Sequence, residues 1–436
     1  MRRPAPPPAA RLALATLLGI VACAGPEGDT SPPGNDGGPD APGAEDGSTP
    51  PDARPDAPQG QCQLTAHERN LDVVPTGAGN HALAWDGSRL ATVYQVEPGY
   101  TELRFAASDS SLDSLGALST FTQGLVDCSL SVAGCHGEPA LTVDGAGALT
   151  LVWAGYDPPH GAVGLHFGHL DGNGVLTGHA TPAAGGADPV AAPALRAAAG
   201  TYQVAWQQGP AVKAGTLDGT GTPSGVASIS SAAETAERPH LAVVGDVVAV
   251  LYTWRTGTGT AKLVLRLGPT GGAFGAEVVL DLGLTRPKGV SLLDLDGVLA
   301  AVIEAEAPAG HGWSAAWVAT LDPATGALLS GPDPAVLADA VGGVVVDSAI
   351  ATPGNDIAIG ATVYDSSDAR AVLQRVNRWG QTLHAEVTAS AGHASIAPVG
   401  MSTRVAWMND RFAVSFVAAP VADSGVLYLR TVTCDF

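Results

Sequence analysis

A unit of two hairpins recurs along most of the chain, and this repeat constrains the fold more than any other feature. Its first block is an apolar strand, an Asp-Gly or Gly turn, and a strand rich in Val and Trp or Tyr. Asp suits such turns because its side chain bonds the local backbone, and Gly because it tolerates positive φ. The copies begin at His81, Pro139, Pro193, Pro239, Gly289, Asp347 and Thr403.

A second block follows within the repeat: a strand, a tight Asp/Asn-x-x-Gly turn and another strand. It is clearest at His169, Thr216, Arg266, Thr320 and Arg375. Two hairpins make four antiparallel strands, and four-stranded sheets at spacings of roughly 46 to 58 residues are typical of β-propellers. The sequence therefore predicts an all-β fold, a single propeller over residues 61–436 with seven four-stranded blades.

The same pattern bears on the alternatives to a seven-bladed propeller. Six or eight blades remain open because the fifth and sixth copies are the most divergent. A β-sandwich explains neither the period nor the number of copies. Long helices are excluded because Pro and Gly, 33 and 56 residues respectively, interrupt every stretch of helical length.

The repeat resembles one found in propellers of secreted and surface bacterial proteins, in which a Pro-x-Val-Ala-Trp-x-Gly strand precedes a Leu-Val-Val-Trp strand. Ala84-Trp85-Asp86-Gly87 and Leu151-Val152-Trp153 show the resemblance best. The signatures of WD, kelch and Asp-box propellers are not found. The resemblance implies a propeller outside the cytoplasm and implies no particular reaction.

The N-terminus has the pattern of an export signal. Arg2, Arg3 and Arg11 precede an apolar run over residues 12–22. Eleven helical residues extend only about 16 Å, too little for a hydrocarbon core of ~30 Å. Residues 1–22 are therefore predicted to be a signal peptide.

The end of that run resembles the lipobox of bacterial lipoproteins. Ile20-Val21-Ala22-Cys23 occupies the expected place, which implies a lipid on Cys23. Ala24 resembles the pattern for sorting to the outer membrane. An ordinary signal peptide with an incidental cysteine is the alternative.

Residues 24–60 are predicted to form a disordered linker behind the lipidated cysteine, so that 23–60 is a stalk. The segment has no Ile, Leu, Val or aromatic residue, and it carries eight acids against Arg54. Such a segment cannot bury enough apolar surface to offset its ordering entropy. The predicted location is the cell envelope, with the membrane as a partner through the lipid.

Two of the cysteines are predicted to close the ring. The last repeat supplies only three strands, over 404–407, 412–417 and 426–432, so the segment beginning at Cys62 must supply the fourth. When the last repeat is aligned with the second, Cys434 corresponds to Leu170 and Cys62 falls near Val175. These two positions face each other across the hairpin turn. A Cys62–Cys434 disulfide follows. Cys128 and Cys135 are expected to pair locally; two pairs of free buried thiols are the alternative.

The predicted function is binding or assembly, with a protein or glycan ligand, through the face that carries the longer connections. The formal charge of −21 argues against nucleic acid as a partner. Aromatic, acidic and basic residues fall on this face. They are Tyr100, Tyr156, Asp157, His160, Trp254, Arg255, Glu306, His311, Trp313, Asp365, Asp368 and Arg370.

A carbohydrate-active hydrolase or lyase is the alternative function. Glu304 and Glu306 share one strand face and are its candidate catalytic residues. No nucleotide, dinucleotide or nucleophile motif appears, so no cofactor is predicted.

Three possible metal patterns have simpler explanations. Cys128, Cys135 and His136 have the wrong spacing for a zinc knuckle. His160, His166, His169 and His179 cluster in the second repeat, but 166 and 169 face opposite sides of a strand. The DGAG, DGNG and DGTG turns lack the alternating oxygen ligands of a Ca²⁺ loop. No metal site is predicted.

Overall fold

The computed structural model describes residues 61–75, 81–96, 102–116, 118–121, 139–157, 162–184, 186–231, 235–256, 261–306, 314–335, 343–364, 369–393, 402–421 and 424–435. The chain divides into two compact units, Met1–Asp56 and Ala57–Phe436, and all of these residues lie in the second. Within them no helix is long and apolar enough to cross a membrane. The predicted signal peptide, lipobox and linker lie outside the described residues.

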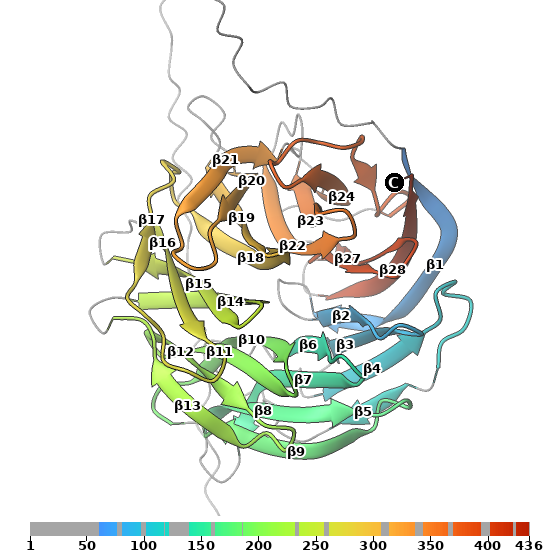
Figure 1. Cartoon of the computed structure of the whole chain (residues 1–436). Helices are drawn as coiled ribbons and strands as arrows, with labels where there is room; N and C mark the ends of the chain where they lie inside the picture. The colour runs from blue at the N-terminus through green and yellow to red at the C-terminus, as the bar shows by residue number, and fades with distance from the viewer. Residues whose placement is uncertain are drawn as a thin grey trace, which may run out of the picture. The chain divides into compact units, whose positions relative to one another are not determined.

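Seven four-stranded antiparallel sheets form a ring, which confirms the predicted seven-bladed propeller (Figure 1). Blade 1 contains β2 (His81–Trp85), β3 (Leu90–Val96), β4 (Glu102–Ser108) and β5 (Ser119–Phe121). Blade 2 contains β6 (Pro139–Val143), β7 (Leu149–Asp157), β8 (Ala162–Leu170) and β9 (Leu176–Ala183). Blade 3 contains β10 (Val190–Ala198), β11 (Thr201–Gln208), β12 (Ala211–Leu217) and β13 (Pro223–Ser228).

The remaining blades continue in chain order around the ring. Blade 4 contains β14 (Thr235–Val244), β15 (Val247–Arg255), β16 (Ala261–Pro269) and β17 (Val278–Leu280). Blade 5 contains β18 (Lys288–Leu295), β19 (Val298–Glu306), β20 (Ser314–Leu321) and β21 (Leu328–Ala335). Blade 6 contains β22 (Val344–Thr352), β23 (Asp356–Tyr364), β24 (Ala369–Asn377) and β25 (Val387–Thr388).

The seventh blade joins the two ends of the ring. It consists of β26 (Arg404–Trp407), β27 (Phe412–Val421) and β28 (Ser424–Cys434), with β1 (Cys62–Pro75) as its outermost strand. Cys62 pairs in register with Cys434, and a disulfide joins them. This confirms the predicted closure. The alignment with blade 2 placed Cys62 near Val175. The strand partner of Leu170 in blade 2 is Leu176, one residue further along the chain.

The hydrophobic core lies between the blades. The first strands of neighbouring blades contact one another around the axis, including β26 with β2 across the closure. Apolar clusters draw on two adjacent blades, as where Val302 of blade 5 packs with Ile359 of blade 6. Tyr94, Trp153 and Trp206 occupy matching positions in second strands and are at most 1% exposed. The repeated aromatic is therefore an element of the packing between blades.

The Asp-Gly turns are stabilised by the Asp side chain, which bonds backbone amides of the same turn. One oxygen of Asp171 accepts hydrogen bonds from the amides of Asn173 and Val175, both at 2.8 Å. Asp144 and Asp218 accept in the same way from amides two and four residues further on. These carboxylates serve as turn caps, as the sequence predicts.

Candidate functional site

A cavity of about 240 Å³ lies at the centre of the ring. Six of the seven innermost strands line it: β6, β10, β14, β18, β22 and β26. Its residues come largely from the first halves of those strands, the ends that follow the longer connections. Pockets for drug-sized ligands measure about 300–1,000 Å³. This cavity is smaller and therefore suits a small molecule or the end unit of a longer one.

Four cationic side chains line the cavity: Arg196 of β10, Arg238 of β14, Lys288 of β18 and Arg404 of β26. We call them the channel cluster. The described carboxylates at the site are Asp347, which lines the cavity, and Glu304, which pairs with Lys288. Four cations against two carboxylates leave a positive excess at the centre of a protein whose net charge is −21.

His240 also lines the cavity, and three of these charges lower its pKa. Burial lowers the pKa of His240 from 6.5 to about 3; the hydrogen bond with the Gly289 carbonyl opposes this, and the positive charges of Arg238, Lys288 and Arg196 lower it further. The Nε2 atom of His240 donates to that carbonyl at 3.0 Å. The imidazole is therefore neutral, and the cations of three blades oppose its protonation.

Arg196 and Arg238 have no carboxylate partner among the described residues. The Nη1 atom of Arg196 donates to the carbonyl of Leu195 at 2.9 Å, and burial lowers the pKa of Arg196. The side chain of Arg238 makes no hydrogen bond or ion pair with a described residue. It lies in a β-bulge between Glu237 and His240, with φ of 50°. Bulges redirect side chains at functional sites, and here the bulge residue lines the cavity.

The other two cations are held in place. Lys288 Nζ lies 3.1 Å from Glu304 Oε2, and that oxygen also accepts from the amide of Val346 at 3.2 Å. Arg404 donates from Nε to the carbonyl of His81 and from Nη1 to the carbonyl of Asp347. These two side chains form the rigid part of the cavity wall.

Asp347 is the acid that lines the cavity. Its carboxylate accepts from Thr362 Oγ1 at 2.7 Å and from the amide of Thr403 at 3.0 Å. Burial raises the pKa of Asp347, although the charge of Arg404 and these hydrogen bonds oppose the rise. The amide of Val346, the residue before Asp347, donates to Glu304 Oε2 and so links β22 to β19.

Three charged residues predicted on the long-connection face pair with oppositely charged residues of their own repeats. Arg255 Nε lies 2.9 Å from Glu237. Glu306 lies 2.9 Å from Arg286, and Arg370 lies 3.4 Å from Glu386. These pairs are partly exposed and do not belong to the cavity wall. Glu304 and Glu306 thus have different surroundings, the first behind the cavity wall and the second at the rim.

The predicted aromatic residues are only partly described. Trp254 is half-buried, and Lys262 Nζ lies 5.6 Å from the centre of its ring. Tyr156 and Asp157 end β7. The other predicted face residues lie outside the described part of the chain, as do Cys23, Cys128 and Cys135. They are Tyr100, His160, His311, Trp313, Asp365 and Asp368.

The described histidines of blade 2 form two separate groups. His166 Nδ1 and His179 Nε2 are 3.1 Å apart, and both rings lie beside Trp153. His169 instead contacts Thr150 at 3.0 Å and the carbonyl of Gly219 at 2.8 Å. The predicted opposite orientation of residues 166 and 169 is thereby confirmed.

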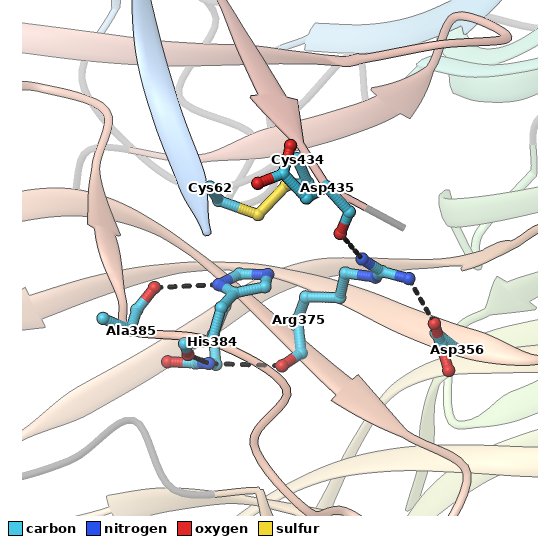
Figure 2. The surroundings of a disulfide bond; sticks show 8 residues. Cys62, Asp356, Arg375, His384, Ala385, Cys434 and Asp435 are labelled. Carbon is cyan, nitrogen blue, oxygen red and sulfur yellow. Dashed lines mark hydrogen bonds and ion pairs between the residues drawn. A yellow bond between two sulfur atoms is a disulfide. The ribbon is translucent and has the colours of Figure 1, made fainter. Parts of the chain in front are cut away.

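A buried polar group surrounds the closing disulfide (Figure 2). Arg375 is 6% exposed; it reaches Asp356 Oδ2 at 2.5 Å and the carbonyl of Asp435 at 3.3 Å. His384 lies beside the disulfide, and its Nδ1 donates to the carbonyl of Ala385 at 2.8 Å. Burial lowers the pKa of His384, the Ala385 carbonyl opposes this, and Arg375 lowers it further.

Sequence reasoning missed the channel cluster and His384. Arg196, His240 and Arg404 lie on first strands of different repeats, 44 and 164 residues apart in sequence, and only ring closure brings them together. One pattern could have found them: several copies place a charged or polar residue where others have Ala. His384 had no such pattern, since it follows a tight turn in a divergent copy.

Comparison with known proteins shows likeness in chain path alone. No protein-family model matches the chain, and no curated protein matches its sequence. A protein of unknown function from Dyadobacter fermentans is 12% identical, with a TM-score of 0.48, over 85% of this chain and 100% of that one. The β-propeller domain of the Trilobed protease from Pyrococcus furiosus is 8% identical, with a TM-score of 0.47, over 83% and 94%.

Carbohydrate-active proteins also occur among the similar structures. The polysaccharide lyase Uly1 is 9% identical, with a TM-score of 0.47, over 83% of this chain and 89% of that one. Family-43 glycoside hydrolases match with lower TM-scores. Identities this low do not transfer a ligand or a reaction, so the function has to be argued from the residues of the cavity.

Proposed function

We propose that the chain is a lipid-anchored cell-envelope protein whose propeller binds a small anionic ligand in its central cavity without catalysis. The ligand class is a carboxylate- or sulfate-bearing sugar, either free or at the end of an acidic glycan. One observation carries this proposal: Arg196 and Arg238 line the cavity, and neither has a carboxylate partner among the described residues.

Guanidinium groups in a confined cavity favour such a ligand for physical reasons. Arg presents several donors in a planar fork that matches carboxylate and sulfate oxygens. Water in a narrow cavity solvates these cations less well than bulk water, which strengthens their attraction for an anion. The small volume limits the bound part to about one sugar unit.

Binding without catalysis is favoured by the engagement of both carboxyls. Glu304 is held by Lys288 and the amide of Val346, and Asp347 by Thr362 and the amide of Thr403. Neither has a second carboxyl opposite it across the cavity among the residues described. Acid/base cleavage of a glycosidic bond ordinarily uses two carboxyls that flank the bond.

The test of binding is calorimetry on the full chain with a uronate trisaccharide, a neutral trisaccharide of equal length and inorganic sulfate. We expect the uronate to bind, with an affinity that falls as salt is added. Arg196→Gln with Arg238→Gln should reduce that affinity at least tenfold, since one hydrogen bond to a charged group contributes about 1.5–3 kcal/mol.

The matched control removes two positive charges elsewhere. Arg255→Gln with Arg286→Gln makes the same change in net charge at rim residues that are already paired. It should leave uronate affinity within about twofold, because exposed ion pairs contribute little. Equal losses in both double variants, or equal binding of neutral and acidic sugars, would contradict a specific cavity site.

A glycan-cleaving enzyme is the second candidate, and one observation favours it. Asp347 lines the cavity with a raised pKa, as a general acid requires, and Glu304 of a neighbouring blade accepts from the amide of Val346, the residue before Asp347. Release of new sugar ends from acidic polysaccharides, lost in both Asp347→Asn and Glu304→Gln, would support this candidate. We expect no release.

The anchor is tested separately. Metabolic labelling with a fatty acid should place lipid on the wild-type chain and none on Cys23→Ser. The variant should then leave the membrane fraction. Absence of label on the wild-type chain would contradict the proposed lipid anchor. That result would not bear on the proposed ligand binding in the cavity.

A further inference from the structure

The closing disulfide and one histidine form a cluster of three metal-ligating groups. Donor atoms of Cys62, His384 and Cys434 all lie within 4.8 Å of one another. Cys62 begins β1, Cys434 ends β28, and His384 lies between β24 and β25, so three segments distant in sequence meet here. Figure 2 shows the imidazole beside the two sulfur atoms.

His384 offers a nitrogen lone pair to this cluster. Its side chain is 3% exposed, and its Nδ1 must carry the proton because a carbonyl oxygen, that of Ala385, can only accept. In the neutral ring Nε2 is then the acceptor. That atom is buried, and no described group donates to it. Buried polar atoms without a partner are rare and often mark a redox or ion site.

We propose that reduction of the Cys62–Cys434 disulfide creates a zinc site formed by the two thiolates and His384 Nε2. The reductant is a dithiol, which gives two electrons and two protons to the disulfide and itself becomes a cyclic disulfide. Zinc binding then releases both thiol protons to water. The two thiolates neutralise the charge of Zn²⁺, and water completes the coordination.

The geometry suits this ion. Bonds of ~2.3 Å to sulfur and ~2.0 Å to nitrogen place tetrahedral ligands about 3.5–3.8 Å apart. The three donor atoms lie within 4.8 Å of one another in the oxidised chain, and the two sulfur atoms would separate to this ligand spacing once their bond is reduced. Two thiolates and an imidazole are soft to borderline donors, which favour zinc over calcium or magnesium. The metal would hold β1 to β28 where the disulfide held them before.

The experiment uses the full chain with Cys23→Ser, Cys128→Ser and Cys135→Ser, so that Cys62 and Cys434 are the remaining thiols. After reduction and anaerobic removal of the dithiol, Co²⁺ is added as a spectroscopic probe. We expect one equivalent to give thiolate charge-transfer and tetrahedral d–d bands, which Zn²⁺ then removes. The oxidised chain should give neither.

The histidine is tested by His384→Gln, which should weaken Co²⁺ binding at least tenfold. The matched control is His67→Gln, an exposed histidine on the same strand as Cys62, which should bind as the parent does. If His384→Gln does not fold, melting of the reduced parent decides instead: Zn²⁺ should raise its Tm. Absent bands in the reduced parent, equal affinity in a folded His384→Gln, or an unchanged Tm would overturn the proposal. None of these results bears on binding in the central cavity.

Discussion

The guanidinium of Arg404 donates a hydrogen bond from Nε to the backbone carbonyl of His81, 3.2 Å away and 323 residues earlier in the chain. This bond joins the first strand of blade 7 to the first strand of blade 1. A second nitrogen of Arg404, Nη1, bonds the carbonyl of Asp347 in blade 6. One side chain thus connects three blades at the wall of the cavity.

Arg404→Gln should therefore destabilise the ring. It leaves buried carbonyls without donors, and each such loss destabilises by about 1–3 kcal/mol. Urea unfolding should show a lower midpoint. Arg411→Gln, which removes an exposed pair with the adjacent Asp410, should change the free energy of unfolding by less than about 0.5 kcal/mol. Equal effects of the two variants would contradict the role of Arg404 in closure.

Removing the closing disulfide should have a larger effect. Cys62→Ala with Cys434→Ala opens a loop with a sequence separation of 372 residues. The expected loss is about 2–5 kcal/mol, because the cross-link restricts the unfolded chain. Thermal unfolding with and without a reductant measures it. The reductant should lower the stability of the wild type but have no such effect through this disulfide in the double variant. If the double variant is as stable as the wild type, the pairing of β1 with β28 is enough to close the ring without the disulfide.

Glu68 should make the attachment of β1 sensitive to acid. Burial alone would raise the pKa of Glu68, but hydrogen bonds and charge from His393 and Arg430 lower it below 4.5. A lowered pKa contributes stability that is complete above the unfolded value and is lost as pH falls through the folded value. Wild type should exceed Glu68→Gln in stability at about pH 6 and lose that advantage below about pH 4. A constant difference across this range would count against the ion pair.

His240 should also favour unfolding in acid, by a different route. Its pKa is about 3 when folded against 6.5 when unfolded, so the unfolded chain gains a proton first as the pH falls. Stability is therefore complete above about pH 6.5 and declines toward pH 3, at most by ~1.4 kcal/mol per pH unit. His240→Gln should reduce this decline. Urea titrations at several pH values measure the decline in the wild type and in the variant.

The closure could be predicted from the sequence because it depends on counting. The last repeat lacks a strand, and the segment at Cys62 supplies one in a register that brings it to Cys434. Repeats also fix the turns, since the carboxylates of Asp171 and Asp218 bond groups within their own turns. The turns could be predicted from one repeat alone, whereas the closure required comparison of the last repeat with the others.

The cavity could not be predicted in the same way. Arg196 and Arg238 look like ordinary strand residues, and their meeting depends on the curvature of the whole ring. The long-connection face was the expected site, yet its described charges Arg255 and Glu306 are paired within their blades. Local sequence carries no information about which charges will lack a partner.

The placement of the disulfide at the first residue of β1 has a mechanical consequence. Tension on the chain that precedes residue 61 enters the propeller at Cys62, before it reaches the hydrogen bonds between β1 and β28. The covalent bond passes that load directly to Cys434 at the other end of the ring. Under a pull that would otherwise unzip an edge strand, the oxidised propeller should behave as a single closed loop.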